Sequence, residues 1–395
     1  MLRKIKILAT VIYQEFWEWN KNLTQLKSEL LQYGDYLENG KYEWLIMSSS
    51  LIVVKHERIE NIPATLQTTL TEFWEKPKDK NLNKRFIVKI RDLLATIRNV
   101  FRKNSTYLTI SSNFHNENKD VNAQIALLRA NGKILLFDID KDLVYIKFAQ
   151  NTSTNSNKFK QPEDQWDHTM MRQEIGRYFS LPIEKKILDS FYQQDLVHGF
   201  AFSDCSFSER LQIVKEICLS SSKMAENFMF KPKITAFDIM KEGFSLALLN
   251  VNQPEMLEYI SSRQQAILML SKSWKIIPSH CDLTAHNLTI LDKHPVLLDL
   301  APHKVGFLPP FFVPMCLIHS EVKEYDRLDL VEAFLDGKLD FEFSFLSGLE
   351  KNSFDKDMRI DLLLSETLAL AATGNKISPQ NIHYWFKPIF DLVKN

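Results

Sequence analysis

Apolar residues in the first part of the chain recur mainly at helical spacing. Residues 11–33 and 61–104 are predicted to be helical, and the apolar runs at 44–47 and 51–54 resemble strands. Within the second helical region one face is apolar and comprises Phe86, Ile87, Ile90, Leu93, Leu94, Ile97, Val100 and Phe101. The remaining positions of 84–103 are mostly Lys and Arg, so this segment is predicted to be a basic amphipathic helix. Residues 104–120 are polar and are interpreted as a linker.

From residue 121 the pattern predicts strands. Two apolar segments, 125–129 and 133–137, flank Asn131-Gly132, a pair that favours a tight turn with positive φ, so a hairpin is expected. A turn at 140–142 leads into a β-branched and aromatic strand that carries Lys147. Helices are expected around residue 174, at 206–228, at 253–274 and over most of 321–395. Strands followed by helices indicate an α+β protein.

Composition limits the classes of function. The 395 residues are too many for one compact core and indicate two or three modules. Lys and Arg number 49 and so do Asp and Glu, so the formal net charge of zero does not favour nucleic acid as a partner. No apolar run of 18 residues or more exists, and the first residues do not form a clear signal peptide. The four cysteines are scattered, which favours reduced thiols and a cytoplasmic location over disulfides or a structural zinc site.

One stretch carries a concentrated set of polar groups. His280, Asp282 and Asn287 form the pattern H-x-D-x-x-x-x-N, and Asp299 ends a short apolar run that is predicted to be a strand. Phosphoryl transfer uses one carboxylate to orient the attacking hydroxyl and accept its proton, and an amide with a second carboxylate to bind metal ions on ATP. The alternative is that Asp282 and Asn287 only cap turns.

This stretch resembles the catalytic and metal loops of the aminoglycoside phosphotransferase and choline kinase-like superfamily, which typically has H-G-D-x-x-x-x-N followed by an I-D pair. Three upstream segments resemble other parts of these enzymes in the same order. Lys147 resembles the strand lysine that contacts the nucleotide phosphates, Glu174 its ion-pair partner, and residues 192–201 the strand and hinge between the lobes. The resemblance covers 121 to about 330 well and the C-terminal helices loosely, and it does not include 1–120.

The resemblance implies a bilobal protein-kinase-like fold with ATP and Mg²⁺ as cofactors. A mainly helical N-terminal extension (1–120) would precede a small antiparallel-sheet N-lobe with its hinge (121–200) and a mainly helical C-lobe (201–395). The resemblance also implies a role for each candidate site residue. Asp282 would be the catalytic base and Asn287 and Asp299 the Mg²⁺ ligands, and the nucleotide would be contacted by Lys147, held by Glu174, and by hinge backbone at Asp195 and Val197.

Two features depart from the superfamily pattern. The glycine-rich loop over the phosphates is missing, and only Gly132 lies in the corresponding turn. Cys281 stands where the superfamily usually has Gly, so its side chain needs room behind the catalytic loop. His280 is interpreted as a support for that loop and not as a proton carrier.

The acceptor is expected to be a hydroxyl of a small molecule, and a sugar or a glycolipid or surface-polysaccharide precursor is favoured. An aminoglycoside or choline/ethanolamine-type acceptor is an alternative, because the C-lobe offers the acids Glu321, Glu324, Asp326, Asp329, Glu332 and Asp336. A catalytically inactive pseudokinase that serves as a binding or scaffold module is a further alternative. A protein Ser/Thr kinase is disfavoured, since neither D-F-G nor A-P-E occurs in its place. The basic helix at 84–103 is expected to pack on its own domain, and peripheral contact with the inner face of a membrane is the second interpretation.

Overall fold

The computed structural model describes ten segments of the chain: residues 40–47, 50–55, 107–110, 123–129, 133–147, 166–188, 191–300, 305–349, 354–373 and 382–394. The helices predicted at 11–33 and 61–104, with the basic segment 84–103, lie outside these residues, as does the Asn131-Gly132 turn. The chain divides into two compact units. One comprises Met1–Gln150 with Pro182–Val197, and the other Asn151–Leu181 with His198–Asn395.

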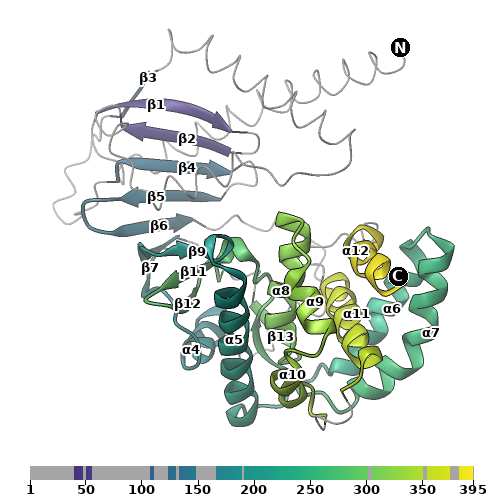
Figure 1. The fold of residues 1–395 in the computed structure, drawn as a ribbon. Coiled ribbons are helices and arrows are strands. Elements are labelled where there is room, and N and C mark those ends of the chain that lie inside the picture. The colour runs from purple at the N-terminus through teal and green to yellow at the C-terminus, as the bar shows by residue number, and fades with distance from the viewer. Residues whose placement is uncertain are drawn as a thin grey trace, which may run out of the picture. The chain divides into compact units, whose positions relative to one another are not determined.

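The first unit contains an antiparallel sheet of eight strands in the order β3-β1-β2-β4-β5-β6-β8-β7 (Figure 1). The strands are β1 (Gly40–Met47), β2 (Ser50–Lys55), β3 (Tyr107–Ile110), β4 (Ile125–Arg129), β5 (Ile134–Asp138), β6 (Leu143–Lys147), β7 (Glu184–Leu188) and β8 (Phe191–Asp195). The predicted hairpin is confirmed, because β4 and β5 pair with Leu128 opposite Ile134. The strand of Lys147 is confirmed as β6, and Asp142 has a φ of 52° in the turn before it.

The sheet extends further toward the N-terminus than the expected boundary at 120. The apolar runs at 44–47 and 51–54 form β1 and β2, and β2 pairs with β4, with Val53 opposite Ala126. The expected linker at 104–120 contains β3, which pairs with β1. Strand β7 was not predicted, because it begins Glu184-Lys185-Lys186. Charged residues of this kind are common on a strand at the edge of a sheet, which is where β7 lies.

The second unit is mostly helical, as predicted. Its helices are α4 (His168–Gly176), α5 (Phe207–Asn227), α6 (Ala236–Asn250), α7 (Pro254–Ser271), α8 (Phe312–Tyr325), α9 (Asp329–Leu335), α10 (Asp340–Ser347), α11 (Lys356–Thr373) and α12 (Ile382–Lys394). Short strands form two small sheets, β10 (Ile277–His280) with β13 (Val305–Leu308), and β12 (His294–Leu297) with β11 (Leu288–Leu291) and β9 (Phe200–Ala201). The helix of Glu174, expected in the N-lobe, packs here against β10 and β13.

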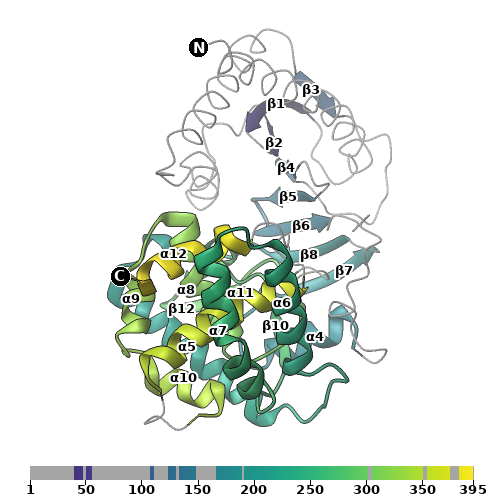
Figure 2. The same ribbon diagram turned by 90° about the vertical axis from the view of Figure 1, so that its right-hand side faces the viewer.

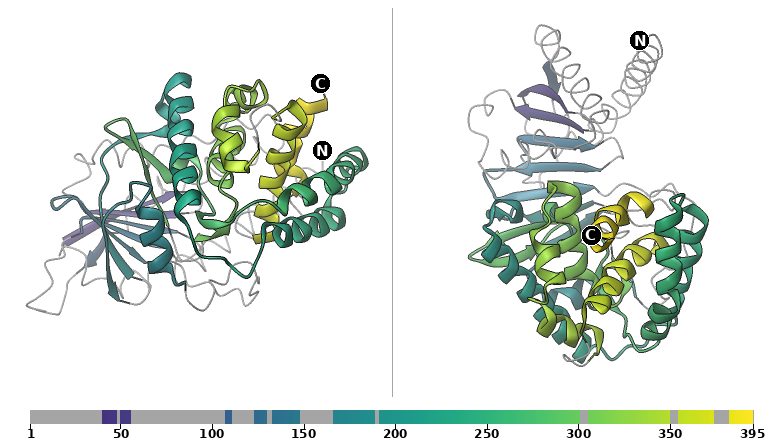
Figure 3. Two further views of the ribbon diagram at one scale, coloured as in Figure 1. Left: turned by 90° about the horizontal axis from the view of Figure 1, so that it is seen from below. Right: turned by 45° about the vertical axis from the view of Figure 1, so that its right-hand side comes forward.

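Helix α11 is the centre of the helical layer. It contacts α6, α7, α8, α9 and α12. In Figures 1 and 3 it lies between the α6–α7 pair and α8, and in Figure 2 α6 and α7 lie in front of it. The close approach of α6 depends on Gly243, where a Cβ atom would be 2.5 Å from the carbonyl oxygen of Leu368. Helix α6 was not predicted, although Thr235 and Asp238 form a capping box at its start. A glycine in the middle of a helix lowers its intrinsic propensity, which obscured the helical pattern.

None of the four cysteines forms a disulfide. Among the described residues, no helix is long and apolar enough to cross a membrane.

Candidate active site

The stretch from His280 to Asp299 folds as one compact structure within the second unit. Strand β10 ends at His280, and the short 3₁₀ helix η4 (Ala285–Asn287) follows Asp282. A hairpin of β11 and β12 then leads to Asp299. Its two turn residues, Asp292 and Lys293, have φ values of 50° and 71°, which is the geometry of a tight hairpin turn.

Cys281 has the room that its side chain requires. Its side chain is buried, and it lies beside Gly306 on β13, the strand that pairs with β10. A Cβ atom on Gly306 would be 3.0 Å from Cys281 Sγ. The space that the Cys281 side chain needs is therefore provided by a glycine on the neighbouring strand. The Cys281 side chain therefore fits behind the loop without distorting it.

His280 connects the catalytic loop to the strand end before Asp299. Its Nε2 is 2.8 Å from the carbonyl oxygen of Leu298, and its Nδ1 accepts a hydrogen bond of 3.1 Å from the backbone N–H of Asp282. Because Nδ1 must be an acceptor and Nε2 a donor, these contacts specify the neutral tautomer with the proton on Nε2. Both ring nitrogens of His280 therefore contact backbone groups, and its supporting role stays a prediction that these contacts favour.

Asp282 and Asn287 lie side by side. The side-chain amide of Asn287 donates to the backbone carbonyl of Asp282 at 2.7 Å, with Asp282 Oδ2 at 3.5 Å. Since the amide group is planar and its nitrogen is directed at Asp282, Asn287 Oδ1 lies on the opposite side of the amide group. The Asp282 side chain is buried, with 7% of the residue exposed.

Asp299 has an unusual backbone conformation. Its φ is 57°, in the left-handed region that non-glycine residues rarely adopt and that often occurs at functional sites. Histidines bind the carbonyl oxygens on both sides of it. His280 Nε2 contacts Leu298 O, and Nε2 of His168, the first residue of α4, is 2.6 Å from Leu300 O. His280 thus engages the peptide group directly before Asp299, and His168 engages the carbonyl of the residue that follows it.

The donor set suits a hard divalent cation. Asn287 and Asp299 offer an amide oxygen and a carboxylate, which are ligands that Mg²⁺ accepts, and its remaining positions are usually filled by phosphate oxygens and water. The described residues contain no cluster of three or more His, Cys, Asp or Glu side chains that would hold a metal ion alone.

The predicted nucleotide contacts lie mostly in the first unit. Lys147 is half-buried at the end of β6, opposite Phe191 of β8. Glu174 belongs to the second unit, where it is buried and accepts a hydrogen bond of 2.5 Å from Arg177. Its pairing with Lys147 stays a prediction.

The hinge backbone is already partly engaged. The N–H of Asp195 donates to Ile183 O at 3.2 Å, and the N–H of Leu196 donates to Asp142 O at 2.7 Å. Of the predicted hinge donors, this leaves the N–H of Val197 as the candidate for an adenine edge.

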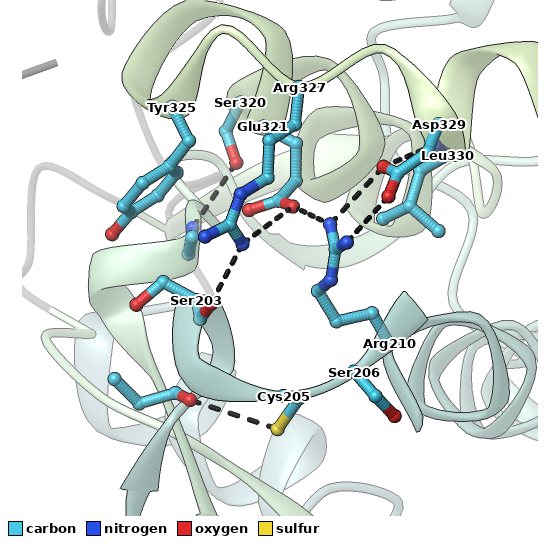
Figure 4. Close-up of polar contacts among 12 residues, drawn as sticks. Ser203, Cys205, Ser206, Arg210, Ser320, Glu321, Tyr325, Arg327, Asp329 and Leu330 are labelled. Atoms are coloured by element: carbon cyan, nitrogen blue, oxygen red, sulfur yellow. Dashed lines mark hydrogen bonds and ion pairs between the residues drawn. The ribbon is translucent and has the colours of Figure 1, made fainter. Parts of the chain in front are cut away.

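Two polar features of the second unit were not predicted from sequence. Ser320 on α8 accepts a hydrogen bond of 3.2 Å from the N–H of Ala285, so α8 directly contacts the loop between Asp282 and Asn287. Next to it, the Glu321 carboxylate is fully buried and bound by Arg210, which also holds Asp329 at 2.6 Å (Figure 4). Burial raises the pKa of Glu321 above its usual value, with Arg210 opposing that shift.

The segment 321–336, which contains the six acids of the C-lobe named above, therefore offers less negative charge than its sequence suggests. Two of its six acids, Glu321 and Asp329, share an ion pair with Arg210 within the chain. Sequence alone could not reveal this, because Arg210 lies 111 positions before Glu321. The argument for a cationic acceptor is weakened accordingly.

No protein-family model matches this sequence, and no curated protein matches it either. Solved kinases of small molecules have similar structures. A choline/ethanolamine kinase family protein from Mesorhizobium loti matches with 10% identity and a TM-score of 0.42, over 66% of this chain and 84% of its own. Choline kinase LicA from Streptococcus pneumoniae matches with 10% identity and a TM-score of 0.41, over 67% of this chain and 90% of its own.

Aminoglycoside phosphotransferases also match. APH(3'')-Id from Streptomyces rimosus, in complex with ADP and streptomycin, has 13% identity and a TM-score of 0.35, over 60% of this chain and 90% of its own. These are the two groups named by the sequence resemblance, and the antiparallel sheet followed by a mostly helical region is consistent with the kinase-like fold. Identities of 10–13% and TM-scores below 0.5 leave the function to be argued from the site's own residues.

Proposed function

We propose that this protein is an ATP- and Mg²⁺-dependent phosphotransferase that transfers the γ-phosphate to a hydroxyl group of a small molecule. The observation that carries the proposal is the hydrogen-bond network within the second unit. Asn287 binds the carbonyl of Asp282, and His280 binds both the Asp282 N–H and the carbonyl before Asp299. This network links the backbone of the three residues to which we assign the chemistry of phosphoryl transfer.

Each residue has a defined task in this proposal. Asp282 orients the acceptor hydroxyl and takes its proton as the new oxygen–phosphorus bond forms and the bond to the ADP leaving group breaks. Asn287 Oδ1 and the Asp299 carboxylate hold the metal ion, which when bound neutralises charge on the phosphates. Lys147 with Glu174, and the backbone of Asp195 and Val197, are the proposed contacts to the nucleotide.

The favoured acceptor is a sugar or a lipid-linked sugar. The argument for a cationic acceptor was the row of acids in the C-lobe, and two of these, Glu321 and Asp329, are bound by Arg210. This weakens the cationic alternative and supports a neutral acceptor. Comparing the rates at which neutral sugars, aminoglycosides and choline are phosphorylated distinguishes these acceptor classes.

Nucleotide binding tests the proposal. Melting of wild type and of Asp299→Ala is compared with ATP, with and without Mg²⁺. A ligand at 100 times its Kd stabilises the folded state by about 2.7 kcal/mol, so binding is readily detected. We expect a Mg²⁺-dependent rise in Tm for wild type that is lost in the variant. The absence of a shift with any nucleotide would instead indicate the pseudokinase, a binding or scaffold module.

A further inference from the structure

Arg327 lies in a niche built from groups that bind organic cations. Its guanidinium carbon is 5.1 Å from the centroid of the Tyr325 ring. Its Nη1 donates to the carbonyl oxygen of Ser203 at 2.7 Å and is 3.7 Å from Glu321 Oε2 (Figure 4). An aromatic face with a carboxylate beside it is a favourable environment for an ammonium or guanidinium group. We call the Tyr325 ring, the Glu321 carboxylate and the Ser203 carbonyl the cation niche.

The cation niche is attached to the catalytic loop. The hydroxyl of Tyr325 is 3.1 Å from Nδ1 of His286, the residue directly before Asn287, and the two ring centroids are 5.4 Å apart. Ser320, which precedes Glu321 on α8, accepts the N–H of Ala285. Two residues of η4, between the proposed base and the proposed metal ligand, thus contact the helix that forms the niche.

In the cation niche, Arg210 alone does not satisfy both oxygens of the Glu321 carboxylate. Glu321 Oε2 accepts from Arg210 and faces Arg327, while the buried Oε1 has no hydrogen-bond partner among the described residues. A buried carboxylate without compensation is costly, so this site favours a second positive group. Arg327 supplies it, and 37% of its side chain is exposed, whereas the side chains of Arg210 and Glu321 are buried.

We propose that Arg327 occupies, from within the chain, the position that the cationic group of an acceptor would otherwise take beside the catalytic loop. Acceptors that carry an ammonium group are thereby excluded, and neutral polyhydroxylated acceptors are favoured. The statement about acceptors rests on the proposed phosphotransferase function, whereas the occupation of the cation niche by Arg327 does not.

Removal of the arginine side chain tests this. The probe is tetramethylammonium chloride, which binds through charge and aromatic contact and cannot donate a conventional hydrogen bond. We expect a saturable rise in the Tm of Arg327→Ala with the probe, no such rise for wild type, and its loss in Arg327→Ala with Tyr325→Leu. Arg327→Gln, which retains a donor for the Ser203 carbonyl, should respond like Arg327→Ala. For a variant that folds poorly, the yield of folded protein with the probe reports the same binding.

Arg359→Ala is the matched control, because Arg359 is held by the Asp340 carboxylate and by the carbonyls of Leu335 and Phe354. It should show only the salt effect seen with sodium chloride. An unchanged Tm for both Arg327 variants, or an equal rise for wild type, would overturn the inference. A hydroxyethyl-trimethylammonium probe should be phosphorylated at least tenfold faster by Arg327→Ala than by wild type. If wild type shows no Mg²⁺-ATP shift, the phosphotransferase function fails while the tetramethylammonium result still decides the niche.

Discussion

His168 Nε2 lies 2.6 Å from the carbonyl oxygen of Leu300, so the first residue of α4 is hydrogen-bonded to the backbone directly after Asp299. His280 makes the corresponding contact to the carbonyl before Asp299. A non-glycine residue keeps a positive φ only if its surroundings hold the backbone in that conformation, and these two histidines contribute to this for Asp299. The position of α4, which also carries Glu174, is thereby coupled to the proposed metal ligand.

His168→Leu should weaken metal–nucleotide binding, because it removes a hydrogen bond to the carbonyl of Leu300 that holds the backbone just after Asp299. A net contribution of about 0.5–1.5 kcal/mol corresponds to a Kd increase of roughly two- to tenfold. Mn²⁺ binding in the presence of ADP, followed by electron paramagnetic resonance, measures this directly. His168→Gln retains an N–H donor and should bind nearly as well as wild type. Equal affinities for His168→Leu and wild type would show that the contact does not position Asp299.

Asp282→Asn should lower kcat by about a hundredfold or more, because the amide cannot accept the hydroxyl proton. Binding of Mg²⁺ and ATP should persist, since Asn287 contacts the backbone carbonyl of residue 282 and not mainly its carboxylate. Single-turnover kinetics with ATP in excess make the measurement. Asp292→Asn, in the exposed hairpin turn, is the control and should have normal turnover. A kcat within a few-fold of wild type would contradict the role given to Asp282.

Gly306→Ala should destabilise the protein, because its new Cβ would lie 3.0 Å from Cys281 Sγ. Overpacking of this kind costs about 1–3 kcal/mol, which is measured by urea unfolding. Cys281→Gly removes the opposing sulfur, so the double variant should be more stable than the sum of the two single changes predicts. Strict additivity would mean that the two positions do not share this space.

Gly243→Ala should destabilise the contact between α6 and α11 although alanine favours a helix by about 1 kcal/mol over glycine. The added Cβ would be 2.5 Å from Leu368 O, a backbone atom that cannot turn aside. We expect a net loss of about 1–3 kcal/mol in the free energy of unfolding, from urea titration. Ser245→Ala, on the exposed side of α6, should leave stability nearly unchanged or slightly raised. A stabilising Gly243→Ala would show that the helices separate freely.

Tyr259 should make the protein sensitive to high pH. It packs against Phe386 and Phe390 of α12, and burial raises its pKa to about 12 from 10.0. Because the folded-state pKa is above the unfolded one, the resulting stabilisation is complete below pH 10 and is lost as the pH rises toward 12. Urea midpoints between pH 9 and 11 should therefore fall more for wild type than for Tyr259→Phe. Parallel pH profiles would contradict this assignment.

The sequence by itself determined the local elements and supplied the candidate residues for phosphoryl transfer. The hairpin of β4 and β5, the strand of Lys147 and the helix of Glu174 were predicted because alternation, turn residues and helical spacing are local signals. His280, Asp282, Asn287 and Asp299 were found together because they lie within 20 consecutive residues of the chain. The tolerance of Cys281 was not predictable, since Gly306 opposes it only after β10 and β13 pair.

Tertiary structure decided what the polar residues outside this stretch do. The sequence suggests that Glu321 and Asp329 belong to an acidic surface, but in the structure Arg210 on α5 binds both carboxylates. Strands β1 to β3 join the same sheet as β4 through pairing between distant residues, which a local pattern does not specify. The same holds for His168, whose contact with Leu300 spans 132 positions. Hydrogen bonds and ion pairs depend on positions in space, and for residues far apart in the chain only the folded backbone supplies those positions.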